Sequence, residues 1–124
     1  MKDRLFKELT LCETQQILAQ WLVQTGLLEN QTIEATLIKL NEEVKETEIE
    51  TLKDPIDKES LGKEIADILW VAINLATVYG IDINEMMLKV MDKNWNRYNP
   101  AKAQALQAEG MTVFESLKQL KSEY

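Results

Sequence analysis

The chain has 124 residues, of which 45% are apolar and 28% charged, a mixture typical of one folded domain rather than a disordered segment. Its net charge is −7 without any basic cluster, so we expect neither a nucleic acid polymer nor an anionic membrane as a partner, because both attract Lys and Arg. Cys12 is the single cysteine, and histidine is absent. The segment MKDRLFKE lacks the apolar core of a signal peptide, so we expect a cytoplasmic protein.

The pattern of apolar residues predicts an all-α protein. Only four glycines and two prolines occur, and no alternating strand pattern is present. We expect four main helices, at about residues 11–25, from 31 or 33 to 52, 60–79 and 83–97, followed by a weaker tail. In that tail, Thr112 and Glu115 are placed to cap one short last helix. No domain boundary is evident, so we expect a single domain over residues 1–124.

The second helix carries three glutamates within the six residues NEEVKE. On a helical wheel, Glu43 and Glu46 lie side by side next to an apolar stripe, whereas Glu42 lies farther round toward solvent. The stripe consists of Ile33, Leu37, Leu40 and Val44. By itself this arrangement favours a solvated acidic flank, which is the usual place of such a run.

The third helix gives the glutamates a second interpretation. The segment GKEIADILWVAINLATV is apolar on nearly every side, so we expect it to be buried, yet Glu64 and Asp67 lie one turn apart on one face. Buried carboxylates need a countercharge or must lose their own charge. Salt bridges with Lys63 or Arg97 could neutralise one of these carboxylates. They would not suffice for four, if Glu43 and Glu46 lie beside Glu64 and Asp67.

The connection between the two helices brings the two pairs of carboxylates to a similar level. Seventeen residues separate Glu46 from Glu64, and the segment KDPIDKES breaks the helix between them. Two antiparallel helices would then place Glu43 and Glu46 opposite Glu64 and Asp67. Such a group of oxygen ligands suits hard cations, Mg²⁺ or its substitute Mn²⁺. A di-iron bundle with Glu-x-x-His motifs is excluded because the chain has no histidine.

EEVKE at residues 42–46 and EIAD at residues 64–67 together resemble the paired motifs of the MazG-like all-α nucleoside triphosphate pyrophosphatases. The following segment, ILWVAINLATVYGIDINEMMLKVMDKNWNRYNP, is similar to that family's third and fourth helices, and the resemblance spans roughly residues 12–100. It implies a four-helix-bundle core at about 12–100, completed by dimerisation, with a C-terminal extension at 101–124 that contains an extra short helix.

The resemblance also implies an activity and roles for individual residues. The implied reaction is Mg²⁺-dependent cleavage of a nucleoside triphosphate to the monophosphate and pyrophosphate, in nucleotide-pool housekeeping. Glu43, Glu46, Glu64 and Asp67 would be the metal ligands. Glu42 would position the attacking water, so that Glu42 and Glu46 are the carboxylates assigned to catalysis.

The fourth helix offers groups that suit the substrate. Lys93 and Arg97 in KNWNRY lie one turn apart and would hold phosphates, the arginine in a bidentate manner. The alternative is that both cations only complement the negative C-terminal end of the helix. Asn94 and Tyr98 match positions that contact the nucleotide in the family. Among the three tryptophans, Trp21 is our candidate for stacking on the base, against a role in core packing.

Two further expectations concern assembly and the competing function. The third helix is too apolar for two short helices to cover, so we expect a homodimer or homotetramer, as relatives of this class form. The alternative to a nucleotide pyrophosphohydrolase is a non-catalytic helical module that senses nucleotides or binds a protein partner. Release of pyrophosphate from a panel of nucleotides distinguishes the two.

Overall fold

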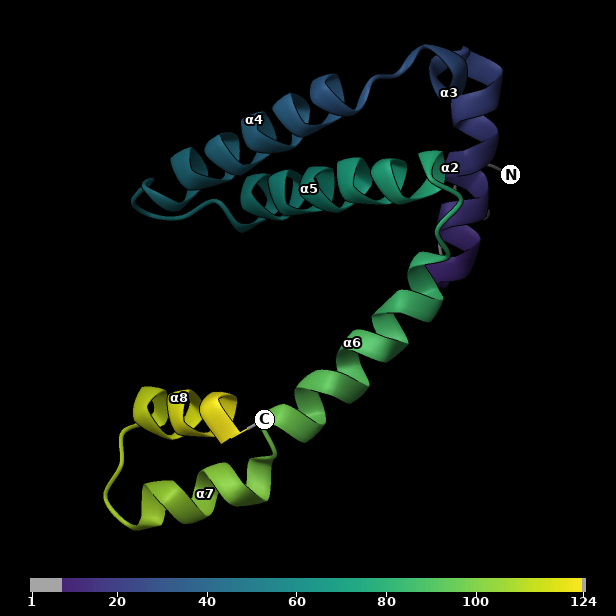
Figure 1. Cartoon of the computed structure of the whole chain (residues 1–124). Helices are drawn as coiled ribbons and strands as arrows, with labels where there is room; N and C mark the ends of the chain where they lie inside the picture. Colours follow the sequence, from purple (N-terminus) through teal and green to yellow (C-terminus); the bar gives the residue numbers. More distant parts are fainter. Residues whose placement is uncertain (1–7, 124) are drawn as a thin grey trace. The chain divides into compact units, whose positions relative to one another are not determined.

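The structure, a computed structural model, describes residues 8–123 and contains no β-strand in that range, as Figure 1 shows. The all-α class predicted from the sequence is therefore confirmed. In chain order the helices are α2 (Leu11–Thr25), α3 (Leu27–Asn30), α4 (Ile33–Thr51), α5 (Lys58–Val78), α6 (Ile83–Arg97), α7 (Pro100–Ala108) and α8 (Val113–Glu123).

Local sequence signals set most of the helix ends. Thr10 forms a capping box with Glu13, because its hydroxyl oxygen accepts a hydrogen bond from the Glu13 amide and its own amide donates to the Glu13 carboxylate. Gly26 ends α2 with φ of 78°, a left-handed conformation that glycine adopts without steric cost. Side-chain oxygens of Thr32 and Asp57 cap α4 and α5. The four main helices therefore lie close to their predicted positions.

The sequence reasoning missed α7, which begins where the fourth helix was expected to give way to irregular chain. The Asn99–Pro100 pair both ends α6 and starts α7. The Asn99 side chain accepts a hydrogen bond of 3.2 Å from the amide of Lys102 and so caps the new helix. Pro100 occupies the first turn, where its missing N–H would have no partner anyway.

The chain divides into two compact units, one up to Ile83 and one from Asn84 onward, and each is described by itself. The division falls at the beginning of α6. The expectation of one domain over residues 1–124 stays a prediction.

In the first unit, α4 and α5 lie side by side as an antiparallel pair, and α2 packs against α5 (Figure 1). The apolar core of this unit lies between α2 and α5, where the following side chains are buried: Leu18, Leu22, Val71, Ile73 and Ala76. The Gln15 amide holds the end of α5 against α2, since it donates to the carbonyl of Ile81 at 2.7 Å and to Oγ1 of Thr77 at 3.2 Å. This packing fixes the C-terminal half of α5.

The two buried residues of α4 are polar and do not belong to its apolar stripe. The buried residues of α4 are Thr36 and Glu43, whereas Ile33, Leu37 and Val44 of the predicted stripe are each at least 40% exposed. In the single chain α5 is covered only in part, and its burial by a second copy stays a prediction. Ile65, Leu69 and Trp70 are exposed, because α2 and α4 cover only part of the helix surface.

Within residues 8–123, no single helix combines the length and the apolar character needed to cross a membrane. One bent pair, Lys58–Val78 with Ile83–Ala108, passes the same test on length and composition.

The second unit contains α6 and the hairpin of α7 and α8. The hairpin encloses Ala103, Ser116 and Leu120, and the Gln107 amide donates a hydrogen bond of 3.1 Å to Oγ of Ser116. Thr112 and Glu115 form the predicted capping box before α8: each backbone amide donates to the other side chain at 3.1 Å. None of the residues of α6 is buried.

Candidate metal and nucleotide site

Three carboxylates converge between α4 and α5. Glu43 of α4, and Glu64 and Asp67 of α5, each present one oxygen, and these three oxygens all lie within 4.8 Å of one another. We call these three residues the acidic cluster. The antiparallel pairing of the two helices brings them to the same level, as the loop length suggested. The structure thus brings together three of the four residues predicted to bind metal.

Glu46, the fourth predicted ligand, lies at the exposed edge of the same group. It lies near enough to Glu64 to raise the pKa of that carboxyl group, although its oxygens are outside the set within 4.8 Å. Burial raises the pKa of Glu64 most, and the neighbouring Glu46 raises it further, followed by the charges of Glu43 and Asp67. Removing a proton from Glu64 is therefore costly while no cation lies among these groups.

Two buried oxygens of the acidic cluster lack a partner. Oε2 of Glu43 and Oε2 of Glu64 receive no hydrogen bond from any residue that the structure describes, and Glu43 is only 4% exposed. Buried acceptors are satisfied in the great majority of cases, and leaving a charged one unpaired is more costly than leaving a neutral one. Both oxygens therefore have free capacity to bind a cation.

Lys39 contacts the acidic cluster and was not among the residues predicted from the sequence. Its Nζ lies 3.0 Å from Oε1 of Glu43 and 3.8 Å from Oε2 of Glu42. The hydrogen bond to Glu43 and the charge of Glu43 raise the pKa of Lys39. The i, i+4 spacing of Lys39 and Glu43 was the available signal. Glu42 itself is 55% exposed, which agrees with its position toward solvent on the wheel.

Glu50 extends the acidic face of α4 by one more turn and was not predicted either. Its Oε1 lies 2.8 Å from Nζ of Lys53, and its Oε2 is buried without a partner among residues 8–123. The hydrogen bond to Glu50 raises the pKa of Lys53, and the negative charge of Glu64 contributes to this shift. The spacing of four residues between Glu46 and Glu50 places both on one side of α4 and was the available signal.

The donor set fits a hard divalent cation. Glu43, Glu64 and Asp67 offer only carboxylate oxygens, which Mg²⁺, Mn²⁺ and Ca²⁺ prefer, and neither imidazole nor thiolate is within the group. A cation among these oxygens would satisfy the two unpartnered atoms and relieve the mutual repulsion that raises the pKa of Glu64.

The first unit also contains a cavity of about 260 Å³, which we call the tryptophan pocket. Trp21 and Trp70 form part of its wall, with ring centroids 5.2 Å apart and planes at 70°, an edge-to-face pair. The full lining consists of Trp21, Leu27, Gln31, Ala35, Thr36, Lys39, Trp70, Val71 and Asn74. Trp21 thus lines a pocket whose wall includes Lys39, the ion-pair partner of the acidic cluster.

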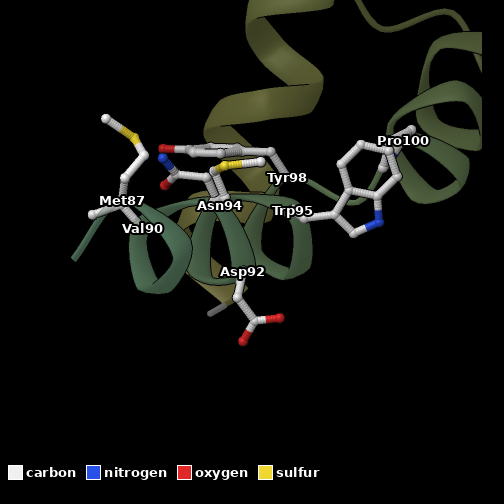
Figure 2. Close-up of a pocket in the computed structure, with 8 residues that line it drawn as sticks. Met87, Val90, Asp92, Asn94, Trp95, Tyr98 and Pro100 are labelled. Carbon is white, nitrogen blue, oxygen red and sulfur yellow. The ribbon is translucent and has the colours of Figure 1, made fainter. Parts of the chain in front are cut away.

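The remaining predicted substrate residues belong to the second unit. Asn94 and Tyr98 line a pocket of about 770 Å³, and Figure 2 shows both on one side of α6, with Asp92 on the opposite side. The guanidinium carbon of Arg97 lies 5.9 Å from the centre of the Tyr98 ring, a cation–π distance. Lys93 is exposed on the same helix. The roles of Lys93, Asn94, Arg97 and Tyr98 in binding substrate stay predictions.

A comparison with protein families matches residues 31–101, more than half of the chain, to the MazG nucleotide pyrophosphohydrolase domain. The chain therefore belongs to this family, and the resemblance inferred from the paired motifs is confirmed. The match covers α4, α5 and α6 and thus every predicted site residue except Trp21. Comparisons with curated proteins and with solved structures found no match.

Proposed function

We propose that the protein is a Mg²⁺-dependent pyrophosphohydrolase that cleaves a nucleoside or deoxynucleoside triphosphate to the monophosphate and pyrophosphate, as part of nucleotide-pool housekeeping in the cytoplasm. One observation carries the proposal. In a chain of the MazG family, three carboxylate oxygens from two facing helices lie within 4.8 Å of one another.

Glu43, Glu46, Glu64 and Asp67 are the residues that we expect to hold the metal. Two of them, Glu43 and Glu64, have unpartnered buried oxygens, and Glu46 lies close enough to raise the pKa of Glu64. When bound, Mg²⁺ supplies charge neutralisation for the phosphates, polarisation of the phosphoryl oxygen and a lower pKa for the attacking water. Mn²⁺ has the same preference for oxygen and should substitute for it.

The carboxylates at the exposed edge of the site are suited to managing the water and its proton. The oxygen of water forms a new bond to phosphorus as the anhydride bond between the α- and β-phosphates breaks, and pyrophosphate leaves. We assign Glu42 and Glu46 to positioning this water and to accepting its proton, because both are exposed beside the buried ligands. Lys39 lies beside Glu42 and Glu43 and neutralises them while no metal is bound.

Residues of both units are proposed to hold the nucleotide. Trp21 would stack on the base in the tryptophan pocket, since aromatic faces stack on any base. Lys93 and Arg97 would hold the phosphates, with Asn94 and Tyr98 as further contacts. For these four, the support is their position within the matched family domain and on or directly after α6.

We also propose a homodimer or homotetramer. The support is the apolar surface of α4 and α5 in the single chain, where Ile38 is 60% exposed, Leu69 56% and Ile65 47%. Burying such surface in a second copy would contribute about 25 cal/mol for each Å². Light scattering of the purified protein tests this directly, and a monomer at micromolar concentration would contradict it.

The activity is tested by incubating the protein with a panel of nucleoside triphosphates and either Mg²⁺ or Mn²⁺ and measuring pyrophosphate. We expect release from at least one nucleotide, and its loss in the Glu46→Gln variant. If no nucleotide yields pyrophosphate at micromolar protein, the chain is a binding module that has kept the fold without the reaction.

A further inference from the structure

Along α4 and α5, residues of the tryptophan pocket and residues of the acidic cluster follow one another. On α4, Thr36 lines the pocket, and Glu43 of the cluster comes about two turns later, roughly 10 Å along the helix. On α5, which runs in the opposite direction, Asp67 of the cluster comes first and Val71 of the pocket follows one turn later. A ligand that fills the pocket and extends along this helix pair therefore leads to the carboxylates.

Lys39 lies where the two sets of residues meet. It follows Thr36 and precedes Glu43 by one turn each on α4. It is the one charged residue among the described residues that line the pocket, and its Nζ lies 3.0 Å from Oε1 of Glu43. The side chain is 55% exposed, so a ligand can reach it from solvent. Lys39 therefore belongs both to the wall of the pocket and to the surroundings of the cluster.

The ammonium of Lys39 has room for another acceptor. An ammonium carries three N–H donors, and among residues 8–123 its ion-pair partners are Glu43 at 3.0 Å and Glu42 at 3.8 Å, of which only the first is at hydrogen-bond distance. A divalent cation held by Glu43 would compete for the same carboxylate and release the lysine further. The carboxylates repel a phosphate group, whereas the ammonium attracts one.

We infer that Lys39 binds the α-phosphate of the nucleotide, with the base in the tryptophan pocket and the β- and γ-phosphates beyond it. This inference rests on the proposed pyrophosphohydrolase function. The bond that breaks joins the α- and β-phosphates, so the α-phosphorus lies at the metal site, and Lys39 is the cation that the pocket and the cluster share. Its charge stabilises the negative charge that develops on this phosphate during attack by water. The monophosphate product keeps the same contact and competes with the substrate.

The test adds phosphates to a nucleoside in steps. The ligands are each of the four common deoxynucleosides, its 5′-monophosphate, and its triphosphate with a methylene group in place of the oxygen between the α- and β-phosphates, which blocks cleavage there. Mg²⁺ is present throughout, and binding is followed by the NMR signals of the tryptophan indole groups, which report weak as well as tight binding. For at least one base, the monophosphate should bind the unmodified protein more tightly than the nucleoside does.

In Lys39→Met this gain from the first phosphate should shrink about tenfold, because a hydrogen bond between charged groups is lost. The triphosphate analogue should lose the same factor and no more, since its other phosphates do not contact Lys39. The nucleoside should bind as before. Each ligand is compared with the nucleoside in the same protein, so a lower fraction of folded protein affects all of them alike.

Two controls separate the phosphate contact from other effects. Lys45→Met removes an exposed lysine of the same helix and should keep the full gain from the first phosphate. Titration with Mn²⁺ without nucleotide should show that Lys39→Met binds the metal at least as tightly as the unmodified protein, since a competitor for Glu43 has been removed. The loss of phosphate affinity then does not come from a loss of metal.

An equal loss for the monophosphate and the triphosphate analogue supports the role of Lys39. The role is overturned by an absent or unchanged gain, by a loss confined to the triphosphate, by an equal loss for the nucleoside, or by weaker binding of Mn²⁺. The hydrolase proposal is judged separately. If the ligands bind as expected but no triphosphate is cleaved, that proposal fails alone, whereas pyrophosphate release with unchanged kcat/KM in Lys39→Met overturns only the role of Lys39.

Discussion

Lys39 and Glu43 form an ion pair across one turn of α4, with 3.0 Å between the ammonium nitrogen and Oε1 of the carboxylate. The glutamate is nearly completely buried, whereas the lysine side chain is 55% exposed. The same glutamate is one of the three residues of the acidic cluster. The lysine therefore provides part of the neutralisation that we propose for Mg²⁺ at this site.

Replacing this lysine should make the fold depend more on metal. In Lys39→Met the buried Glu43 loses its charged partner, so we expect the metal-free protein to melt at a lower temperature. Saturating Mg²⁺ should raise the melting temperature more in this variant than in the unmodified protein. Thermal unfolding with and without Mg²⁺ measures both, and Lys45→Met, at an exposed lysine of the same helix, is the control. Equal Mg²⁺ shifts in all three proteins would contradict this role.

Neutralising a carboxylate of the cluster should separate activity from stability. Glu43→Gln and Asp67→Asn remove charge from the site, so turnover should fall by about 100-fold or more, because metal assistance is worth several kcal/mol. The metal-free variants should melt no lower than the unmodified protein, since repulsion within the cluster is relieved. Pyrophosphate release and calorimetry provide the measurements. Glu48→Gln, at an exposed site of α4, should leave both unchanged.

The raised pKa of Glu64 predicts how the stability of the metal-free protein changes with pH. Its ordinary value is 4.5, and the folded state holds the proton more tightly than the unfolded state. The stabilisation from this proton is complete below the ordinary value and is lost as pH rises through the higher folded pKa. The unfolding free energy of the unmodified protein minus that of Glu64→Gln should therefore decrease as pH rises above 4.5. A difference that increases with pH would show that Glu64 is stabilised as an anion.

The cap of the last helix gives a prediction of opposite sign. The hydrogen bond from the side chain of Thr112, and then that from its backbone, lower the pKa of Glu115. The ionised glutamate stabilises the start of α8 above its unfolded pKa, and this stabilisation is lost as pH falls through the lower folded value. Thr112→Ala should return the pKa of Glu115 toward its ordinary value and cost about 1 kcal/mol. Carboxyl NMR shifts during a pH titration test this, and an unchanged titration of Glu115 would contradict it.

The sequence was sufficient for the helices because their ends are encoded locally. Thr32 and Gly26 act as a cap and a stop in the structure as they do in the sequence. The start of α7 was missed because Pro100, read as the end of one helix, is also a favourable first residue of the next. Where two helices follow one another closely, a residue pair such as Asn99–Pro100 can mark the end of the first helix, the start of the second, or both.

Residue spacing also suggested the convergence of Glu43, Glu64 and Asp67, since it fixes the level and the face of each carboxylate once the helices are antiparallel. The orientation of α4 was harder to predict. Leu37 and Val44 of its apolar stripe are half-exposed, while Glu43 beside the stripe is buried. A helical wheel shows which residues share a face, but not which neighbour covers that face. The place of Lys39 in the wall of the tryptophan pocket has no signal in the sequence, because the lining of a cavity depends on the packed structure.

The central claim is that the carboxylates of α4 and α5 bind one or more divalent cations. The most direct measurement is a crystal structure of the protein with Mn²⁺, using anomalous scattering to locate the ion. We expect an anomalous peak bounded by Glu43, Glu64 and Asp67, with Lys39 displaced from Glu43. Side chains that diverge around an empty centre, at a Mn²⁺ concentration that supports any activity, would contradict it.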